Sequence, residues 1–229
     1  MLVCISDLFD LTHTIAAPLL ARFVMPWEAL DFLSDFIYET GAQLDSAQYD
    51  SPADGVWIAK SARVAENAVI QPPCIIGARA EIRPGAYIRG SVIVGEDAVV
   101  GNSTEVKNAI LFDRVQIPHF NYCGDSILGY RAHMGAGAIT SNVKSDKTYV
   151  TINGVYRIET GRKKCGAMLG DFVEIGCNCV LSPGTVIGRG TRVYPLTHVR
   201  GVIGENQIVK SADVIVEQRV YTAETAGGR

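Results

Sequence analysis

Branched aliphatic residues recur at every sixth position through much of this chain. They fill nine consecutive register positions, Ile58, Val64, Ile70, Ile76, Ile82, Ile88, Val94, Val100 and Val106. A second register of mostly small residues follows four positions after each of them, beginning with Ala62, Ala68 and Cys74. The period resumes at Leu169, Ile175, Leu181, Ile187, Val193 and Val199. Because a period of six matches neither an α-helix nor one long strand, it predicts short parallel strands separated by tight turns.

Three such strands close one triangular coil of about 18 residues, the unit of a hexapeptide β-solenoid. The large aliphatic side chains should point into the prism, and the small ones should fit near its corners. Five glycines directly follow register residues, where we expect turns that need a permissive backbone: Gly77, Gly95, Gly101, Gly176 and Gly188.

The register is looser between Val106 and Leu169. Leu128 slips by one position, and residues 140–168 break the period altogether. We interpret this segment as an external loop inserted in the prism, and long ordered loops often carry function.

The first 50 residues follow a helical pattern instead. Apolar positions between Met25 and Gly41, with Pro26 near the start, predict an amphipathic helix. An earlier helix is expected around residues 6–23, broken near Pro18, and we expect this region to cap an exposed end of the solenoid. The predicted organisation is a helical region at 1–50, a solenoid at 51–210 with a loop at about 140–168, and a C-terminal tail at 211–229.

Composition narrows the classes of partner. The 229 residues are 48% hydrophobic, and 21 basic against 24 acidic residues give a net charge of −3. This balance provides no field that would attract nucleic acid or an anionic membrane. The apolar stretch from Ile15 to Met25 is interrupted by Pro18 and Arg22, so we expect neither a signal peptide nor a membrane span, and a cytoplasmic location follows.

The six cysteines lack the spacing of a disulfide framework, and we interpret them as free thiols in a reducing compartment. Cys177 and Cys179 are two residues apart, and we expect their side chains to point to opposite sides. A shared metal ion is therefore not expected, and the chain is predicted to need no metal.

Three cations follow register aliphatics directly: Arg83, Arg89 and Lys107. Arg89 and Lys107 are 18 residues apart, so one coil should stack them about 4.8 Å from each other. Such a pair is suited to an anion, for example a phosphate held by a forked arginine and a lysine. The alternative is a surface ion-pair ladder, because Glu105 lies two residues before Lys107.

Polar residues are dense in the segment His119–Asp125, where the register is weakest. A histidine with a near-neutral pKa can accept a proton from an amine nucleophile, which makes His119 a candidate general base. The alternative for His119, as for His133 and His198, is a purely structural role. We assign no chemistry to His13.

Four motifs in order carry a resemblance to a known family: Arg83-Pro84-Gly85, Val100–Lys107, His119–Asp125 and Gly135–Asn142. Together they resemble the acetyltransferase half of bacterial bifunctional N-acetylglucosamine-1-phosphate uridyltransferase/glucosamine-1-phosphate acetyltransferase. The likeness spans roughly residues 78–210. It implies a left-handed parallel β-helix that assembles as a homotrimer and acetylates an amino-sugar phosphate with acetyl-CoA as co-substrate.

The resemblance also implies roles for individual residues. His119 would be the general base for the sugar amine. The remaining substrate-binding positions would be Arg83 and Lys107 for the phosphate, with Glu105, Tyr122, His133, Asn142 and Lys147 around the sugar. Contacts to acetyl-CoA would come from Ala136, Cys177, Pro195 and Lys210. Transfer would be direct, with backbone N–H groups stabilising the oxyanion and no covalent enzyme intermediate.

The chain departs from the family at several of these positions. His133 stands where the family has asparagine, Cys177 where serine is usual, and Lys210 near an arginine that binds the CoA phosphates. The loop that holds Lys147 is longer than the family's. Nothing in residues 1–50 resembles the Gly-rich nucleotide loop of the uridyltransferase half, so uridyl transfer is not expected.

Two other functions stay open from the sequence. One is a non-catalytic protein that binds a sugar phosphate or associates with a nucleotidyltransferase, which His133 and Cys177 would suit. The other is a zinc carbonic anhydrase of the hexapeptide class, which needs three converging histidines. His119 and His133 are 14 residues apart and no closely spaced histidine pair exists, which disfavours the carbonic anhydrase.

Overall fold

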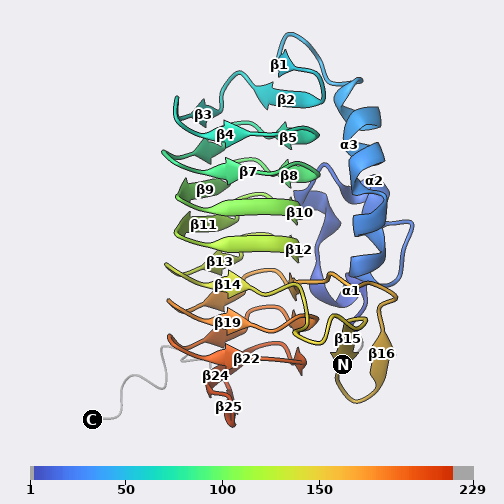
Figure 1. Ribbon diagram of the computed structural model, residues 1–229, viewed down its shortest axis with the longest axis vertical. Helices are drawn as coiled ribbons and strands as arrows, with labels where there is room; N and C mark the ends of the chain where they lie inside the picture. Colours follow the sequence, from blue (N-terminus) through green and yellow to red (C-terminus); the bar gives the residue numbers. More distant parts are fainter. Residues whose placement is uncertain (1–2, 219–229) are drawn as a thin grey trace, which may run out of the picture.

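The six-residue period corresponds to the turns of a triangular prism of stacked parallel strands (Figure 1). The computed structural model describes residues 3–218. We name the three faces A, B and C; in each coil the chain runs along face B, then C, then A. Strands of one face pair in parallel with those of the coils above and below, which confirms the fold class predicted from the repeats.

Each face is a ladder of short strands. Face A contains β4 (Val69–Ile70), β7 (Tyr87–Ile88), the first parts of β10 (Glu105–Leu111) and β12 (Tyr122–Leu128), β14 (Ile139–Thr140), β19 (Val180–Leu181) and β22 (His198–Val199). Face B contains β2 (Val56–Ala59), β5 (Cys74–Ile76), β8 (Val92–Val94), the later parts of β10 and β12, β17 (Ala167–Leu169), β20 (Thr185–Ile187) and β23 (Val202–Ile203). Face C contains β3 (Arg63–Val64), β6 (Glu81–Ile82), β9 (Val99–Asn102), β11 (Gln116–His119), β13 (His133–Met134), β18 (Glu174–Ile175), β21 (Arg192–Val193) and β24 (Gln207–Ser211). Two antiparallel strands flank this stack, β1 (Tyr49–Ala53) against β2 and β25 (Val214–Glu217) against β24.

The register aliphatics fill the interior of the prism. Ile76, Ile88 and Val100 are fully buried, and so are the small-register residues Ala80 and Ala98. Each buried Ile or Val side chain contributes about 1.5–3 kcal/mol relative to an exposed one. Burial of this repeated pattern is therefore what stabilises successive coils.

The glycines after the register residues serve a purpose other than the predicted one. Gly95 and Gly101 do not adopt a positive φ, whereas Asp97 and Ser103, two residues further on, do so at 54° and 52°. A Cβ at Gly95 would lie 2.5 Å from the Asp113 nitrogen, and one at Gly101 would lie 1.5 Å from the Pro118 oxygen. We expected glycine at these two positions for its freedom to adopt a positive φ, and this was wrong. Glycine is required there because the adjacent coil leaves no room for a Cβ atom.

The slip in the register marks a tighter corner between faces A and B. Ile88 and Val94 are six residues apart, but their partners in the next coil, Val106 and Leu111, are five apart. β10 and β12 therefore run through this corner without interruption. The single residue that turns each of them, Asn108 in β10 and Asp125 in β12, has a positive φ.

The N-terminal region consists of short helices along face B, visible beside the prism in Figure 1. They are α1 (Ile5–Leu8), η1 (Leu11–His13), α2 (Ala17–Leu20), η2 (Pro26–Asp31) and α3 (Leu33–Gly41). The single helix expected from Met25 to Gly41 is thus a 3₁₀ helix followed by an α-helix. α3 packs on β5 and β8, and the carbonyls of His13 and Leu8 accept hydrogen bonds from Asp113 and Asp171 at 3.0 Å.

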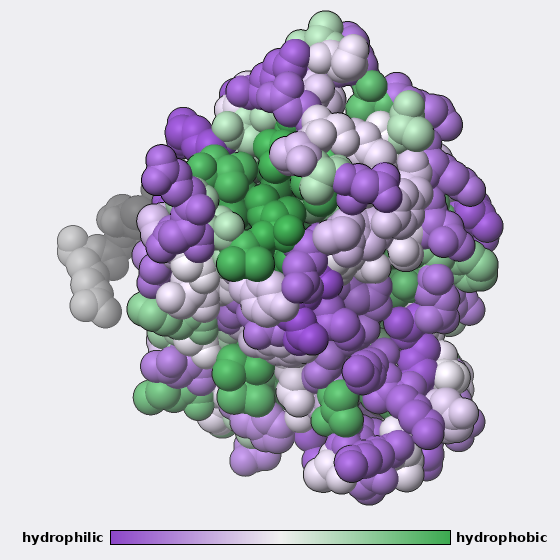
Figure 2. Space-filling view, turned by 45° about the horizontal axis from the view of Figure 1, so that its top comes forward, coloured by the Kyte–Doolittle hydropathy of each residue, from purple (hydrophilic) through white to green (hydrophobic). Residues whose placement is uncertain are grey.

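The expectation that these helices cap an end of the solenoid was therefore wrong. The first coil stays open: Val64 is 36% exposed and Val69 is 53% exposed. Ile58 and Ile70, which belong to the interior register, are only partly buried. Figure 2 brings this end forward and shows a hydrophobic area there. The helices lie elsewhere because their apolar residues join the buried core along face B.

The inserted segment leaves the prism at the A–B corner and folds into a hairpin, β15 (Thr151–Asn153) and β16 (Arg157–Glu159). Val150 and Ile152 are fully buried, and Arg162 forms an ion pair with Asp31 of the N-terminal region. The predicted loop is therefore an ordered, anchored structure.

The predicted C-terminal tail begins as the antiparallel strand β25, and residues 219–229 lie outside the described part of the chain. Within residues 3–218, no helix has the length and apolarity needed to cross a lipid bilayer.

Candidate functional site

His119 lies at the corner between faces C and A, at the end of β11. It pairs with Asn102 in the coil above, and its carbonyl accepts a hydrogen bond from Gly137 at 3.0 Å in the coil below. The same bond repeats from Asn178 to Ala136 at 2.8 Å and from Leu196 to Cys177 at 2.9 Å. The candidate base and three acetyl-CoA candidates, Ala136, Cys177 and Pro195, therefore occupy equivalent positions of successive coils. We call this set the corner column.

The fourth acetyl-CoA candidate continues the same line. Val193 pairs with Val209, which places Lys210 below Tyr194 and next to the end of the corner column. Four coil steps separate His119 from Lys210, a distance of about 19 Å at the spacing of parallel strands. Cys177, Pro195 and Lys210 are all exposed along this line, and an extended thioester co-substrate could lie against them.

A buried asparagine holds the corner that carries His119. The Asn121 side chain is 3% exposed, and its Oδ1 accepts a hydrogen bond from the His119 backbone at 3.1 Å. Its Nδ2 donates to the carbonyls of Gly135 at 2.8 Å and Ala138 at 3.1 Å in the next coil. One amide therefore joins the His119 corner to the corner of Ala136.

A second group of candidates lies together on face A. Glu105 and Tyr122 occupy one register position in adjacent coils, and Lys107 follows two residues after Glu105. Asn142, at the start of the inserted segment, donates to the Tyr122 hydroxyl at 3.1 Å. Burial, and then the nearby Asp125 carboxylate, raise the pKa of Tyr122, so its hydroxyl stays protonated at neutral pH. Tyr122 is three residues from His119 around the C–A corner.

Asp125 organises the far edge of this group at the A–B corner. Its side chain is 3% exposed, and Lys107 Nζ lies 3.8 Å from its Oδ2. Asn108 Nδ2 donates to Oδ1 at 2.8 Å, and Asn142 Nδ2 donates to Oδ2. The buried carboxylate therefore determines where the Lys107 ammonium and the Asn142 amide lie.

The stacking of Arg89 and Lys107 is confirmed, and so is the participation of Glu105. The Arg89 guanidinium donates a hydrogen bond to the Glu105 carboxylate at 2.7 Å, which raises the pKa of the guanidinium. With Lys107 beside Asp125, both cations have a carboxylate partner in the isolated chain. A phosphate that binds here would compete with Glu105 for Arg89 and with Asp125 for Lys107.

Arg83 does not join Lys107 within one chain. It follows β6 on face C, where it lies 3.3 Å from Glu81 of that strand, whereas Lys107 projects from face A. The phosphate site implied for this pair thus cannot form from one copy. Lys147 is exposed in the inserted segment, where its φ is +56°.

His133 lies with the acetyl-CoA candidates rather than with the face A group. Its Nδ1 is 2.8 Å from Glu174 on face C. Both line a groove of about 510 Å³ that also includes Cys177, Tyr194 and Pro195. The groove runs beside the corner column, so His133 faces the expected path of the co-substrate.

The cysteines are free thiols, as predicted. Cys177 is exposed and Cys179 is buried. The expected reason was wrong, because residues two apart on a strand share a face, and both cysteines lie in the turn between β18 and β19. Burial raises the pKa of Cys74, Cys123 and Cys165 to about 12, so these three thiols are inert at neutral pH. In the described part of the chain, no group of three or more His, Cys, Asp or Glu residues is placed to hold a metal ion.

Sequence reasoning missed the two residues that hold the site, Asp125 and Asn121. The slip at Leu128 was a signal for Asp125, because a five-residue step requires a tight turn with a positive φ, which Asp and Asn tolerate. For Asn121 the sequence offered only its position inside the motif His119–Asp125. Its burial and two of its three bonds depend on the coil below.

The family described as the GMPPB C-terminal domain matches residues 70–187. A bifunctional sugar-1-phosphate nucleotidylyltransferase/acetyltransferase of Sulfurisphaera tokodaii is 35% identical over 128 residues, which are 56% of this chain and 32% of the relative. The bifunctional protein GlmU of Methanococcus vannielii is 34% identical over 139 residues, 60% of this chain and 34% of the relative. The chain thus spans about a third of the length of these curated relatives, and the resemblance to the bifunctional family is confirmed.

Among solved structures, the chain is similar to a point mutant of AntD, an N-acyltransferase from Bacillus cereus in complex with dTDP and coenzyme A. The TM-score is 0.38 at 18% identity, with 76% of this chain and 91% of that chain covered. WeeI from Acinetobacter baumannii gives a TM-score of 0.42 at 14% identity over 67% of this chain and 57% of that one.

Proposed function

The chain belongs to the GMPPB C-terminal domain family, and from this premise we propose that it is an acetyl-CoA-dependent N-acetyltransferase acting on an amino-sugar phosphate such as glucosamine 1-phosphate. The observation that carries the proposal is the corner column, in which His119 stands in line with Ala136, Cys177 and Pro195. The names of the bifunctional relatives, which include an acetyltransferase, support the same class of reaction.

In the proposed reaction the amine nitrogen of the sugar attacks the carbonyl carbon of the thioester. The His119 imidazole takes the proton that the nitrogen releases. The tetrahedral intermediate then collapses by breaking the carbon–sulfur bond, and the imidazolium returns the proton to the leaving thiolate. Backbone N–H groups at the corner would stabilise the oxyanion. No bond to the protein forms, so no serine or cysteine nucleophile is needed.

The face A group is suited to the acceptor sugar. Glu105 and the Tyr122–Asn142 pair offer hydrogen-bond partners for hydroxyl groups, and Lys107 offers a charge for the phosphate. All of them are on the side of the C–A corner that His119 borders. The acceptor would therefore approach from face A and the co-substrate from face C, with His119 between them.

The proposal includes a homotrimer. Arg83 projects from face C and Lys107 from face A of one chain, so a phosphate that contacts both needs two copies, with face C of one against face A of the next. Lys147, on the exposed inserted segment, would approach the same pocket from an adjacent copy. This arrangement would also supply further positive charge near the carboxylates of Asp125 and Glu105.

A second candidate function is a protein that binds the sugar phosphate without transferring an acyl group. The observation that favours it is that His133, paired with Glu174, and exposed Cys177 line the same groove. At these two positions the family resembled by this chain usually has asparagine and serine. This protein would bind the amino-sugar phosphate and leave acetyl-CoA intact.

The two functions are separated by measuring free thiol release from acetyl-CoA with a panel of amino-sugar phosphates, with binding of each acceptor measured in parallel. Release that depends on one acceptor supports the transferase. Acceptor binding without release supports the binding protein, and neither binding nor release with any acceptor contradicts both.

A further inference from the structure

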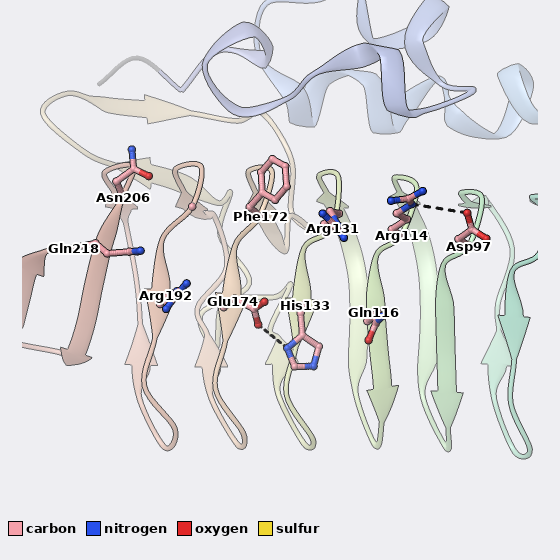
Figure 3. Close-up of a pocket in the computed structure, with 11 residues that line it drawn as sticks. Asp97, Arg114, Gln116, Arg131, His133, Phe172, Glu174, Arg192, Asn206 and Gln218 are labelled. Carbon is pink, nitrogen blue, oxygen red and sulfur yellow. Dashed lines mark hydrogen bonds and ion pairs between the residues drawn. The ribbon is translucent and has the colours of Figure 1, made fainter. Parts of the chain in front are cut away.

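A charged cavity lies at the opposite edge of face C, at the corner between faces B and C, and the proposed reaction does not use the arginines of this corner. It has a volume of about 850 Å³ and is open to solvent. Figure 3 shows two rows of side chains in it, one from the turns of the corner and one from the strands of face C. Arg114, Arg131 and Phe172 belong to the turn row, and Arg192 and Gln218 belong to the face C row.

Arg114 and Arg131 are held as a pair by the fold. Arg131 donates its backbone N–H to the Asp113 carbonyl at 3.1 Å, so the two arginines occupy equivalent positions of adjacent coils, about 4.8 Å apart along the stack. Their guanidinium carbons lie 6.0 Å and 5.9 Å from the centre of the Tyr130 ring. That ring is in turn stacked on His13 of the N-terminal region at 3.7 Å. Both cations are thus positioned against a rigid aromatic platform.

The two carboxylates that line the cavity, Asp97 and Glu174, contact other side chains more closely than they contact its arginines. Asp97 lies 3.9 Å from Arg114, but it accepts hydrogen bonds from Arg79 at 2.8 Å and 3.0 Å. Glu174 is paired with His133 at 2.8 Å. Over residues 3–218, no carboxylate lies within ion-pair distance of Arg131 or Arg192. The cavity therefore offers two guanidinium groups without a carboxylate partner and a third that is only weakly paired.

Two further features point to a ligand with an organic part. Phe172, in the same turn row, is 49% exposed, and its ring lies edge-on to the Tyr130 ring at 5.5 Å. Gln218 also lines the cavity. An exposed aromatic ring suits the face of a nucleobase, and an amide side chain suits its polar edge.

We infer that this cavity binds a nucleoside diphosphate, with the two phosphates between Arg114 and Arg131 and the base against Phe172. Forked guanidinium groups at the spacing of one coil match the oxygens of adjacent phosphates. The Gln218 amide would contact the polar groups of the nucleoside. Arg114 and Arg131 lie at the B–C corner, whereas His119 lies at the C–A corner. The cavity shares His133, Glu174 and Arg192 with the groove beside the corner column.

The test is calorimetric titration of the full chain with UDP, GDP, ADP and dTDP, and with inorganic diphosphate, at one fixed low salt concentration because exposed charges are screened by salt. At least one nucleoside diphosphate should bind about fivefold or more tightly than inorganic diphosphate, because base stacking adds to the phosphate contacts. Equal affinity for inorganic diphosphate would overturn the assignment of the base to Phe172. Absence of binding by every probe would overturn the site.

Variants locate the binding. Arg131→Gln should weaken nucleoside diphosphate and inorganic diphosphate alike by about tenfold. Phe172→Ala should weaken the nucleoside diphosphate alone. Arg200→Gln, an exposed arginine after β22 on face A, is the matched control and should bind as the wild type does. Unchanged affinity in Arg131→Gln, with an unchanged melting temperature, contradicts the inference.

Coenzyme A also carries a nucleotide, so its competition must be measured. Saturating CoA should leave nucleoside diphosphate binding unchanged, and Arg131→Gln should leave acetyl-CoA turnover unchanged. If CoA displaces the nucleoside diphosphate, the cavity is part of the co-substrate site and the inference of a separate site fails. Absence of turnover in the wild type with retained nucleotide binding would instead count against the proposed acyl transfer alone.

Discussion

The side chain of Asn121 accepts a hydrogen bond from the backbone N–H of His119 at 3.1 Å. Asn121 lies two residues after His119 at the same corner. Because the same amide donates to two carbonyls of the next coil, the position of His119 depends on a single buried side chain. This bond links the stability of the solenoid to the geometry of its candidate base.

Replacing this amide tests that link. Asn121→Ala should lower the free energy of unfolding by about 1–3 kcal/mol, because two buried carbonyls lose their donor. It should also lower kcat more than it raises KM, since the base is displaced while the binding surfaces stay. Asn153→Ala, an exposed asparagine of β15, is the control and should change neither. Thermal melting and steady-state kinetics measure both effects; a kcat equal to the wild type would show that Asn121 is only structural.

Lys107 is predicted to bind the phosphate of the acceptor. Lys107→Gln should raise KM for a phosphorylated amino sugar about tenfold, because a charge-assisted contact is lost. KM for the same sugar without phosphate should hardly change. Lys60→Gln, an exposed lysine outside the site, is the comparison. An equal rise of KM for both acceptors would place Lys107 in a general structural role through Asp125.

Cys177 reports the path of the co-substrate without any assay of activity. It is exposed, so it should react first with iodoacetamide, ahead of the four buried thiols. Acetyl-CoA should slow this alkylation, since Cys177 lies in the corner column. Cys4, which is partly exposed in the N-terminal region, should react at the same rate with and without acetyl-CoA. Equal rates at Cys177 under both conditions would argue that the co-substrate does not lie along this corner.

The buried thiols predict how stability changes with alkaline pH. Burial raises the pKa of Cys123 from 9.0 to about 12. The folded chain therefore keeps the thiol protonated while the unfolded chain ionises it, so this contribution is complete below pH 9 and is lost as pH rises toward 12. The melting temperature should fall between about pH 9 and about pH 11, and less steeply in Cys123→Ala. Parallel curves for the two proteins would contradict this account.

The repeats predicted the prism because each strand buries the same register, so periodicity alone identifies inward-facing residues such as Ile82 and Val100. The position of the N-terminal helices could not be predicted in this way. Their apolar faces could cover either the open end or a side of the prism, and only the packing of α3 on β5 and β8 decides between them.

The same limit applies to the site. Family motifs pointed to His119 and Lys107, and the spacing of 18 residues stacked Arg89 beside Lys107 correctly. The contacts of each cation depend on residues that are neighbours only in the folded chain. Asp125 contacts Lys107 from the next coil, and Arg83 contacts Glu81 on face C. The sequence of one chain therefore does not predict which residues of two copies would contact the same ligand.

The most direct test of the central claim is acetyl-CoA turnover, followed by free thiol release, in the wild type, His119→Ala and the control His198→Ala. His198 is an exposed histidine of β22 bonded to Ser182 at 2.8 Å, outside the site. With the acceptor identified from the panel, His119→Ala should lose roughly 10²-fold or more in kcat at an unchanged melting temperature, and His198→Ala should match the wild type. Turnover in His119→Ala equal to that of the wild type would contradict a histidine-dependent acyl transfer at this corner.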